Sequence, residues 1–491
     1  MNISFIENNC NNELLTIFEK NKYLFEIGNI YEKINMYDKA IHDYYIEIIQ
    51  TEPQNFIVLN QIGVCYYNIS QYKLAIYYFN KVLKIIEIPH AYVNIGICYE
   101  TIKDYSSAGL NFLKAYGIDS NNCRINFYLG KIYYILKDYD KSIKYYKKIN
   151  DYKINPNVKY NTSFSYLAKK KFEKGFELYE NRLMYNNINP DTKLLERLEI
   201  PSLNLWNGKD ICNKLLIIYE EGLGDNIQYY RFIIELSELY PEMVIHYFCK
   251  QNVSHIFKSY DKIKIIDNII IKNTNNENYF QNYDYNIYIM SLPSILKLKV
   301  IYPNKVNYIN TNEITFNFWK EQFSSLKKYK VGFVYNGLSS CFIENEIPLI
   351  NFEILTDLDI DLICIHRKKD IIKDISNIPD TFKEKIHLYE FDTETQLVDT
   401  IHILQNIDLL ITIDTYIVHL AGILNIKTWL LLGYYSEWRW STEDSTYWYN
   451  SVELVRMKEK KEFKNILENV KNKLIETLNE INNNNEKVIS E

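Results

Sequence analysis

The sequence predicts an α-solenoid of paired helices followed by an α/β domain built from two Rossmann-like halves. Three observations lead to this prediction. A motif recurs every 33 to 35 residues in the first third of the chain. Short apolar runs alternate with helical stretches after Pro201, and a polar stretch divides these runs into two groups. The chain has 491 residues, enough for about three domains at roughly 150 residues each.

The repeat is marked by glycine, with a tyrosine three residues later, a small residue after nine more, and an aromatic residue after a further four. Small residues at fixed offsets let two helices approach closely, and the aromatic residues fill the space beside the next pair. This is the 34-residue pattern of tetratricopeptide helix pairs. The positions are Gly28, Gly63, Gly96 and Gly130; Tyr31, Tyr66, Tyr99 and Tyr133; Ala40, Ala75, Ala108 and Ser142; and Tyr44, Phe79, Phe112 and Tyr146.

A fifth, weaker unit is expected around 157–189, as is typical of a terminal repeat. Such arrays usually present a concave surface to a peptide or protein, although a spacer or dimer surface is the alternative. With the usual repeat geometry the groove would be lined by Glu26, Gln61, Asn94 and Tyr128.

After Pro201 the apolar runs read as strands of parallel sheets, with helices between them. The expected strands are Leu215–Tyr219, Met243–Phe248, Lys330–Tyr335, Asp361–His366, Asp408–Ile413 and Lys427–Leu432, and the expected helices include Ile227–Tyr240, Glu313–Leu326 and Thr395–Gln405. We therefore expect a cap at 1–21, about five repeats at 22–190, a linker at 191–212, halves at 213–305 and 328–458 joined by 306–327, a helix at 459–481 and a disordered tail at 482–491.

Composition excludes several classes of function. The formal net charge of −6 argues against a strongly basic nucleic-acid binder. Leu409–Tyr435 is the most apolar stretch, but its charged and polar residues make it a poor membrane span. The first residues lack the features of a secretory signal, so a cytoplasmic location is expected. The eight cysteines have no zinc-ligand spacing, and we expect no metal site.

Two loops at expected strand ends carry candidate binding residues. Ligands of open α/β folds bind at the carboxyl ends of strands. In the first loop, Gly222 and Gly224 allow close backbone approach, and Asp225 either points into a cleft or simply caps the next helix. In the second, Asp414 and Thr415 precede a helix whose free N–H groups suit a phosphate. A capped helix is the alternative there.

His419 lies one turn after Thr415 on the same helix face, and a histidine buried in the core is the alternative interpretation. A third loop, Gly433–Tyr449, holds Trp438, Arg439, Trp440 and Trp448. Aromatic residues with one arginine suit a base, a sugar ring or a phosphate. A packed aromatic cluster explains the same residues equally well.

Several segments together resemble one family: FEKGFELYENRL, LWNGKD, EEGLGDNIQYYRF, DLLITIDTYIVHLAG and LLLGYYSEWRWSTEDSTYWY, following the repeats. The chain resembles tetratricopeptide proteins of bacterial type that carry a glycosyltransferase family 9-like domain. That domain has the GT-B fold and is related to the lipopolysaccharide heptosyltransferases and, more distantly, to the O-GlcNAc transferases.

The resemblance implies an inverting, metal-independent transferase of the hexosyl or heptosyl class. It would use a nucleotide sugar as co-substrate, without any other cofactor, and a protein or glycan as acceptor. It implies that Asp225 is the general base. The donor would be bound by Gly222, Gly224, Asp414, Thr415, His419, Trp438 and Arg439.

The loop Tyr335–Leu349 departs from the family, because it contains Glu344 and Glu346 and no Lys or Arg. The resemblance leaves Ser339 and Ser340 to contact phosphate, and Arg367, with the two lysines after it, to supply positive charge. The departure keeps a second hypothesis open, a non-catalytic adaptor on a degenerate transferase scaffold. A redox enzyme is disfavoured, since no GxGxxG follows a strand.

Overall fold

The structure is a computed structural model that describes residues 15–185, 204–220, 222–267, 282–303, 307–337, 347–391, 396–440, 442–458 and 463–490. The chain divides into two compact units, Met1–Tyr166 and Leu167–Glu491. The division falls within the fifth helix pair. Its second helix therefore belongs to the α/β unit, whereas the sequence placed the end of the repeats near residue 190.

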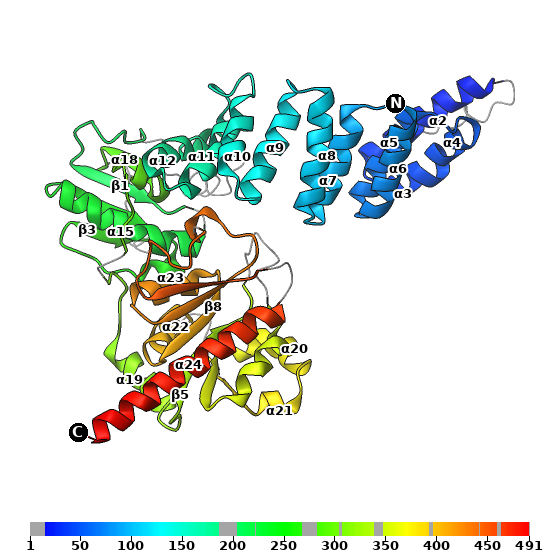
Figure 1. The fold of residues 1–491 in the computed structure, drawn as a ribbon. Coiled ribbons are helices and arrows are strands. Elements are labelled where there is room, and N and C mark those ends of the chain that lie inside the picture. The colour runs from blue at the N-terminus through cyan, green and yellow to red at the C-terminus, as the bar shows by residue number, and fades with distance from the viewer. Residues whose placement is uncertain are drawn as a thin grey trace. The chain divides into compact units, whose positions relative to one another are not determined.

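The repeat unit consists of antiparallel helix pairs (Figure 1). Helix α2 begins before Lys22, where the repeats were expected to start. The elements are α2 Ile17–Lys33, α3 Tyr37–Lys39, the π-helical turn η1 Ala40–Tyr45, α4 Ile46–Thr51, α5 Phe56–Asn68, α6 Tyr72–Ile85, α7 Pro89–Thr101, α8 Tyr105–Ile118, α9 Cys123–Ile135, α10 Tyr139–Lys147 and α11 Pro156–Ala168.

The repeat glycines are required because an aromatic ring of the second helix lies directly on each of them. A Cβ added at Gly96 would lie 2.5 Å from a ring carbon of Phe112, and the glycines of the second and fourth repeats are covered in the same way. In the first repeat the covering ring belongs to Tyr45 and not to Tyr44 as predicted. The π-helical turn adds one residue before this position, which moves the next aromatic residue into contact.

Each first helix ends in the same left-handed turn. The residue seven after the repeat glycine has a positive φ in all four repeats, and Lys170 has one at the matching place of the fifth pair. The sequence pattern for the fifth unit was weak, yet its turn has the same backbone geometry. The residues are Asn35, Ser70, Lys103, Lys137 and Lys170.

The α/β unit begins with two short helices and a four-stranded parallel sheet in the order β3-β2-β1-β4. This order corresponds to the first four strands of a Rossmann fold. Its elements are α12 Phe172–Tyr179, α13 Arg182–Tyr185, β1 Lys214–Ile218, α15 Leu223–Leu239, β2 Val244–Phe248, α16 Gln251–Ser254, β3 Ile263–Ile266, β4 Tyr285–Tyr288, η3 Ile289–Ser291 and α18 Leu292–Ile295.

The second sheet has six parallel strands in the order β10-β9-β8-β5-β6-β7, which is the complete Rossmann order 3-2-1-4-5-6 read in reverse. The strand order changes direction between β5 and β8, and their carboxyl ends meet there. Its elements are α19 Glu313–Gln322, β5 Tyr329–Val334, η5 Leu349–Asp357, β6 Ile360–Cys364, η6 Lys368–Ile371, α20 Ile372–Ser376, α21 Asp380–Lys383, β7 Ile386–Leu388, α22 Gln396–Gln405, β8 Leu409–Ile413, α23 Tyr416–Ile423, β9 Thr428–Leu432, η7 Trp438–Trp440, β10 Val452–Arg456 and α24 Phe463–Ser490.

The predicted fold class is therefore confirmed: helical repeats precede two Rossmann-like halves with the strand orders of a GT-B-like domain. All six predicted strands are present, whereas β3, β4, β7 and β10 were not predicted. The predicted disordered tail at 482–491 differs from the structure, in which α24 continues to Ser490. No glycine or proline occurs between Phe463 and Ser490 to end the helix earlier.

Candidate active site

The glycine loop of the first half lies at the carboxyl end of β1 and leads into α15. The backbone N–H of Gly222 donates to Asp225 Oδ2 over 3.2 Å, so Asp225 caps the helix that it begins. Its other carboxylate oxygen, Oδ1, accepts from Arg439 Nη2. About a quarter of the Asp225 side chain, 23%, is exposed. The capping alternative therefore holds, and the carboxylate still reaches the surface between the two halves.

Gly224 lies where the two halves touch. A Cβ at this position would come within 3.0 Å of His419 Cδ2 and 3.5 Å of the Tyr416 Cα on α23. Glycine at this position is explained by the close approach of α15 to α23. The first glycine loop and the Asp-Thr loop, which are distant in the chain, are thereby brought side by side.

Asp414 and Thr415 follow β8 at the point where the strand order of the second sheet reverses. The hydroxyl oxygen of Thr415 accepts from Ile417 N–H over 3.3 Å and so caps α23. Gly337, after β5, approaches the same threonine, since an added Cβ would lie 2.8 Å from Thr415 Cγ2. The predicted phosphate loop is thus a capped helix start next to the end of the neighbouring strand.

The carboxyl group of Asp414 is surrounded by protein and by other acids. Burial and the carboxylate of Glu437 raise the pKa of Asp414 to about 7, although Arg439 opposes this shift. Near neutral pH a substantial fraction of Asp414 is therefore protonated. In that form its hydroxyl can donate a hydrogen bond, and it adds no negative charge to the site.

His419 is held as a neutral imidazole. Its Nδ1 lies 3.0 Å from the Tyr449 hydroxyl, and its ring stacks on Trp440 with centroids 5.5 Å apart. Burial, with a contribution from Arg439, lowers the pKa of His419 to about 3. Tyr449 packs against Gly422, where an added Cβ would lie 2.3 Å from its ring. The buried-histidine alternative is the arrangement that the structure has.

Arg439 is the centre of the cluster. Its guanidinium donates hydrogen bonds from Nη2 to Asp225 and from Nη1 to Glu437, and only 15% of the side chain is exposed. Two carboxylates, Asp225 and Glu437, therefore share one guanidinium, and the buried Asp414 carboxyl interacts with it electrostatically. Sequence reasoning did not single out Glu437, although its position two residues before Arg439 in the same loop was the available signal.

Two other predicted residues lie at the edge of this cluster, since the Trp438 ring centroid is 5.4 Å from Arg439 Cζ and the charge of Arg367 acts on Tyr416. Trp438 is also buried in an aromatic cluster, against Phe176 of α12 at 5.9 Å and Trp448 at 6.2 Å between ring centroids. Its packing and its place beside Arg439 therefore go together. Arg367, after β6, donates Nε to Asp370 over 2.6 Å. Ser339, Ser340, Glu344 and Glu346 lie outside the described residues.

A buried ion pair that was not predicted joins α13 to the ends of β1 and β4. Arg182 donates hydrogen bonds from Nε and Nη2 to the two carboxylate oxygens of Glu220, each over 2.7 Å. Its Nη2 also donates a hydrogen bond to Ser291 Oγ over 2.9 Å. Both charged side chains are 1% exposed. An arginine just after a helical run gave no sequence signal for a buried partner in a different element.

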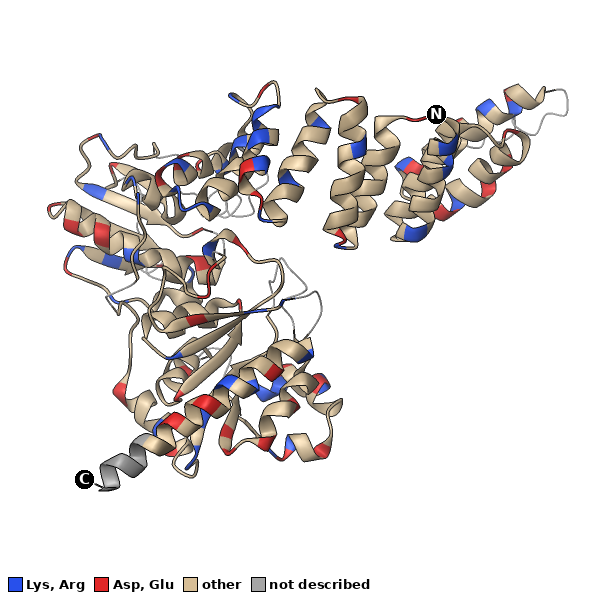
Figure 2. Ribbon diagram, in the orientation of Figure 1, with Lys and Arg blue, Asp and Glu red and all other residues tan. Residues whose placement is uncertain are grey.

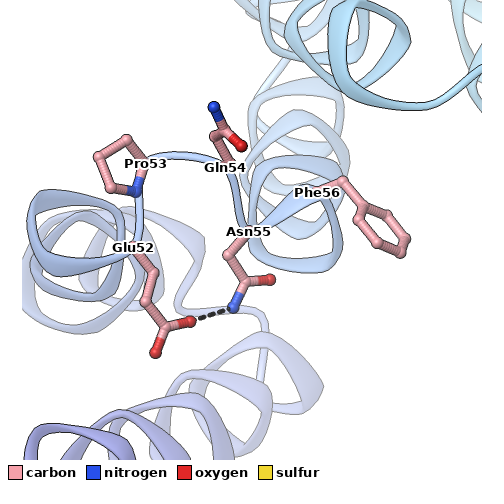
Figure 3. A pocket seen from close by; sticks show the side chains of 5 residues that line it. All are labelled: Glu52, Pro53, Gln54, Asn55 and Phe56. Carbon is pink, nitrogen blue, oxygen red and sulfur yellow. Dashed lines mark hydrogen bonds between the residues drawn. The ribbon is translucent and has the colours of Figure 1, made fainter.

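In the repeat unit, three of the four predicted groove residues contact residues of neighbouring repeats. Gln61 Nε2 donates to Glu32 over 3.0 Å, and Asn94 Nδ2 donates to Asn60 over 3.1 Å. Tyr128 stacks on a phenylalanine of the preceding repeat, and Glu26 is exposed. Figure 3 shows a shallow pocket lined by consecutive residues of one inter-helix turn, Glu52, Pro53, Gln54, Asn55 and Phe56.

Comparison with known proteins supports the repeat assignment. Residues 89–122 and 124–153 match the tetratricopeptide repeat model. A TPR repeat-containing protein of Methanocaldococcus jannaschii is 25% identical over 255 residues, which cover 50% of this chain and 43% of that protein. The chain thus spans less than half the length of this relative.

Solved structures with lower identity resemble parts of the chain. They include YrrB, titled a TPR protein with an unusual peptide-binding site (17% identity, 40% of this chain, 96% of that one, TM-score 0.30), and MamA from Desulfovibrio magneticus RS-1 (21%, 36%, 95%, 0.30). The E. coli ADP-heptose LPS heptosyltransferase II is 13% identical and covers 50% of this chain and 90% of its own, with a TM-score of 0.38.

The chain therefore combines tetratricopeptide repeats with a GT-B-like α/β domain, and the latter assignment rests on the two strand orders. Within the described parts of the chain, no helix has both the length and the apolar character needed to cross a bilayer.

Proposed function

We infer that the α/β unit is a nucleotide-sugar-dependent glycosyltransferase, inverting and metal-independent, and that the repeats bind its acceptor or a partner protein. The observation that carries this proposal is the position of Asp414 and Thr415. They stand at the switch point of a six-stranded Rossmann sheet, beside a glycine loop that carries a partly exposed carboxylate.

The proposed reaction uses Asp225 as general base. Its carboxylate would take the proton of an acceptor hydroxyl while that oxygen bonds to the anomeric carbon and the bond to the diphosphate breaks. The leaving diphosphate would lie at the start of α23, where backbone N–H groups and the helix dipole stabilise negative charge. Protonated Asp414 would add a hydrogen-bond donor there.

Donor binding must then change the partners of Arg439. The guanidinium is divided between Asp225 and Glu437, so an arriving diphosphate competes with both for the same donors. If the diphosphate forms an ion pair with Arg439, the Asp225 carboxylate loses its countercharge and can accept a proton. Donor binding would in this way prepare the base.

A nucleotide screen followed by a turnover assay tests this proposal. UDP, GDP, ADP, CMP and their common sugars would be compared by thermal shift, since a ligand of the folded state raises the melting temperature. We expect one nucleotide to stabilise the protein and Thr415→Val to abolish the shift. Asp225→Asn should lower transfer or hydrolysis by roughly 10²- to 10⁴-fold. Glu238→Gln, an exposed position on the same helix α15, is the matched control and should keep full activity.

One observation favours the second candidate, a non-catalytic adaptor. Two carboxylates, Asp225 and Glu437, already share the single guanidinium of the site, which is a poor environment for a dianionic diphosphate. If no nucleotide raises the melting temperature at millimolar concentration while the protein stays folded, the adaptor hypothesis is favoured.

A further inference from the structure

Asn226 stands in the first turn of α15, directly after Asp225, and its side chain is buried against the glycine loop. Only 1% of the residue is exposed. Its Nδ2 donates hydrogen bonds to the carbonyl oxygens of Glu220, over 2.6 Å, and of Gly222, over 2.7 Å. Its Oδ1 accepts a hydrogen bond from the backbone N–H of Glu220 over 3.3 Å. One amide thus joins the end of β1 to the start of the helix.

Tyr247, on strand β2, completes the hydrogen bonding of this amide. Its hydroxyl donates to Asn226 Oδ1 over 2.8 Å, and its side chain is fully buried. A primary amide has two N–H donors and an oxygen with two lone pairs, so all four positions of Asn226 are occupied. Because Glu220 offers both an N–H and a carbonyl, one orientation of the amide satisfies all of these partners.

The hydrogen bonds of Asn226 reach Asp225 through Gly222. The carbonyl of Gly222 accepts from Asn226, and its N–H donates to Asp225 Oδ2 over 3.2 Å. Gly222 is therefore held on both sides, and a shift of its backbone would remove the N–H that orients the Asp225 carboxylate. Misplacing a reacting group by about 1 Å can cost an enzyme roughly a hundredfold in rate.

The first residue of the loop is fixed from a second direction. Arg182 of α13 donates hydrogen bonds to both carboxylate oxygens of Glu220, each over 2.7 Å. Asn226 binds the backbone N–H and the backbone carbonyl of the same glutamate. Glu220 is therefore anchored through its side chain and its main chain, and the glycine loop begins and ends at fixed points.

Such support is more than a surface carboxylate needs. Acidic residues are common on the helices of the α/β unit, where Figure 2 marks them in red. A surface charge requires no fixed position. A general base does, because its oxygen must lie within hydrogen-bond reach of the proton that it takes. Reactive side chains are held to that precision by the hydrogen bonds of the residues behind them.

We propose that Asn226 is the positioning residue for Asp225, and that Tyr247 holds the Asn226 amide in the orientation that this requires. Asp225 is a general base only if the proposed function holds, so this role of Asn226 rests on that function. The alternative is that the same hydrogen bonds only stabilise the junction between β1 and α15.

The test compares two tyrosine variants of the full-length protein. Tyr247→Phe removes the hydroxyl that bonds to Asn226. Tyr230→Phe is the matched control, since Tyr230 is equally buried, lies 5.5 Å from Tyr247 between ring centroids, and donates its hydroxyl to the carbonyl of Lys258 over 2.7 Å. Turnover, as transfer or hydrolysis, is measured with each UDP, GDP, ADP or CMP sugar that gives a thermal shift.

We expect the kcat of Tyr247→Phe to fall about fivefold while the donor KM stays within about twofold, because one hydrogen bond behind the base is lost and the donor loop is unchanged. Tyr230→Phe should keep both constants within about twofold of wild type. Asn226→Ala removes the amide itself and should lower kcat about a hundredfold. Thermal unfolding checks each variant, and the tyrosine pair decides the matter if Asn226→Ala does not fold.

Hydrogen exchange followed by mass spectrometry gives a readout that needs no turnover. The amides of residues 218–227 should exchange faster in Tyr247→Phe than in wild type or Tyr230→Phe. Faster exchange with an unchanged kcat would overturn the proposal, because the hydrogen bonds would then serve stability alone. In an active protein, equal kcat values for the two tyrosine variants, or a loss confined to donor KM, would overturn it and leave the proposed function intact. A wild type that turns over no nucleotide sugar would refute the proposed function and this role of Asn226 together.

Discussion

Replacing Arg182 by methionine should destabilise the α/β unit by about 3–5 kcal/mol. In the folded protein the guanidinium makes two bonds to Glu220, one to Ser291 and one to Glu180. Methionine fills similar space but leaves the Glu220 carboxylate, 1% exposed, in the interior without its countercharge. The desolvation of that charge is then uncompensated, and it dominates the loss.

The double variant Arg182→Met, Glu220→Met isolates this cause. It removes both charges, and buried ion pairs replaced by apolar residues are often neutral in stability. We therefore expect the double variant to recover at least half of what the single variant loses. A contribution from packing of Arg182 over the Tyr179 ring, 4.9 Å away, would not be recovered.

Urea unfolding followed by tryptophan fluorescence is the appropriate assay. All six tryptophans lie after residue 200, so their emission reports on the α/β unit and not on the repeats. A shift of the midpoint with an unchanged slope measures the change in stability. The reasoning is refuted if the single variant loses less than about 1 kcal/mol, or if the double variant is less stable than the single.

Three further changes have expected outcomes. Gly96→Ala places a methyl group against Phe112 and should lower stability by about 1–3 kcal/mol in thermal unfolding, whereas Gly117→Ala, with open space around it, should be neutral or slightly stabilising. The folded protein keeps the Asp414 proton up to pH about 7, while the unfolded chain releases it near 3.8. Between pH 5 and 7, wild type should therefore lose stability relative to Asp414→Asn, by at most about 1.4 kcal/mol per pH unit; a pH-independent difference would contradict this. Gly224→Ala should force α15 and α23 apart and lower the midpoint seen by tryptophan fluorescence, and an unchanged midpoint would argue against that contact.

The repeats and the main strands could be predicted because their patterns are local. Gly96 and Phe112 stand in consecutive helices of one repeat, and the strand around Leu409–Ile413 is a continuous apolar run. The four strands that were missed are short or interrupted by polar residues. Ile386–Leu388 contains only three residues, and Val452–Arg456 contains two charges, so neither has a clear period.

The sequence placed the candidate residues at the sheet edges where the structure has them, but it did not predict their bonding, and their function stays a prediction. Residues after parallel strands can be placed at one sheet edge from the sequence alone, which brought Asp225 and Asp414 into consideration. The partners of a side chain depend on tertiary contacts instead. Arg439 was expected to be free for a phosphate, yet it pairs with Asp225 of the other half, and no pattern in the sequence encodes that pairing.

The π-helical turn of the first repeat also explains why the interval from Gly28 to Gly63 is 35 residues while the next two are 33 and 34. One additional residue is absorbed within a single wide turn, and the aromatic residues that follow return to their usual intervals. Gain of a codon in this helix would thus be tolerated without disturbing the downstream register. The repeats have a built-in route by which their length can drift during evolution while their stacking is preserved.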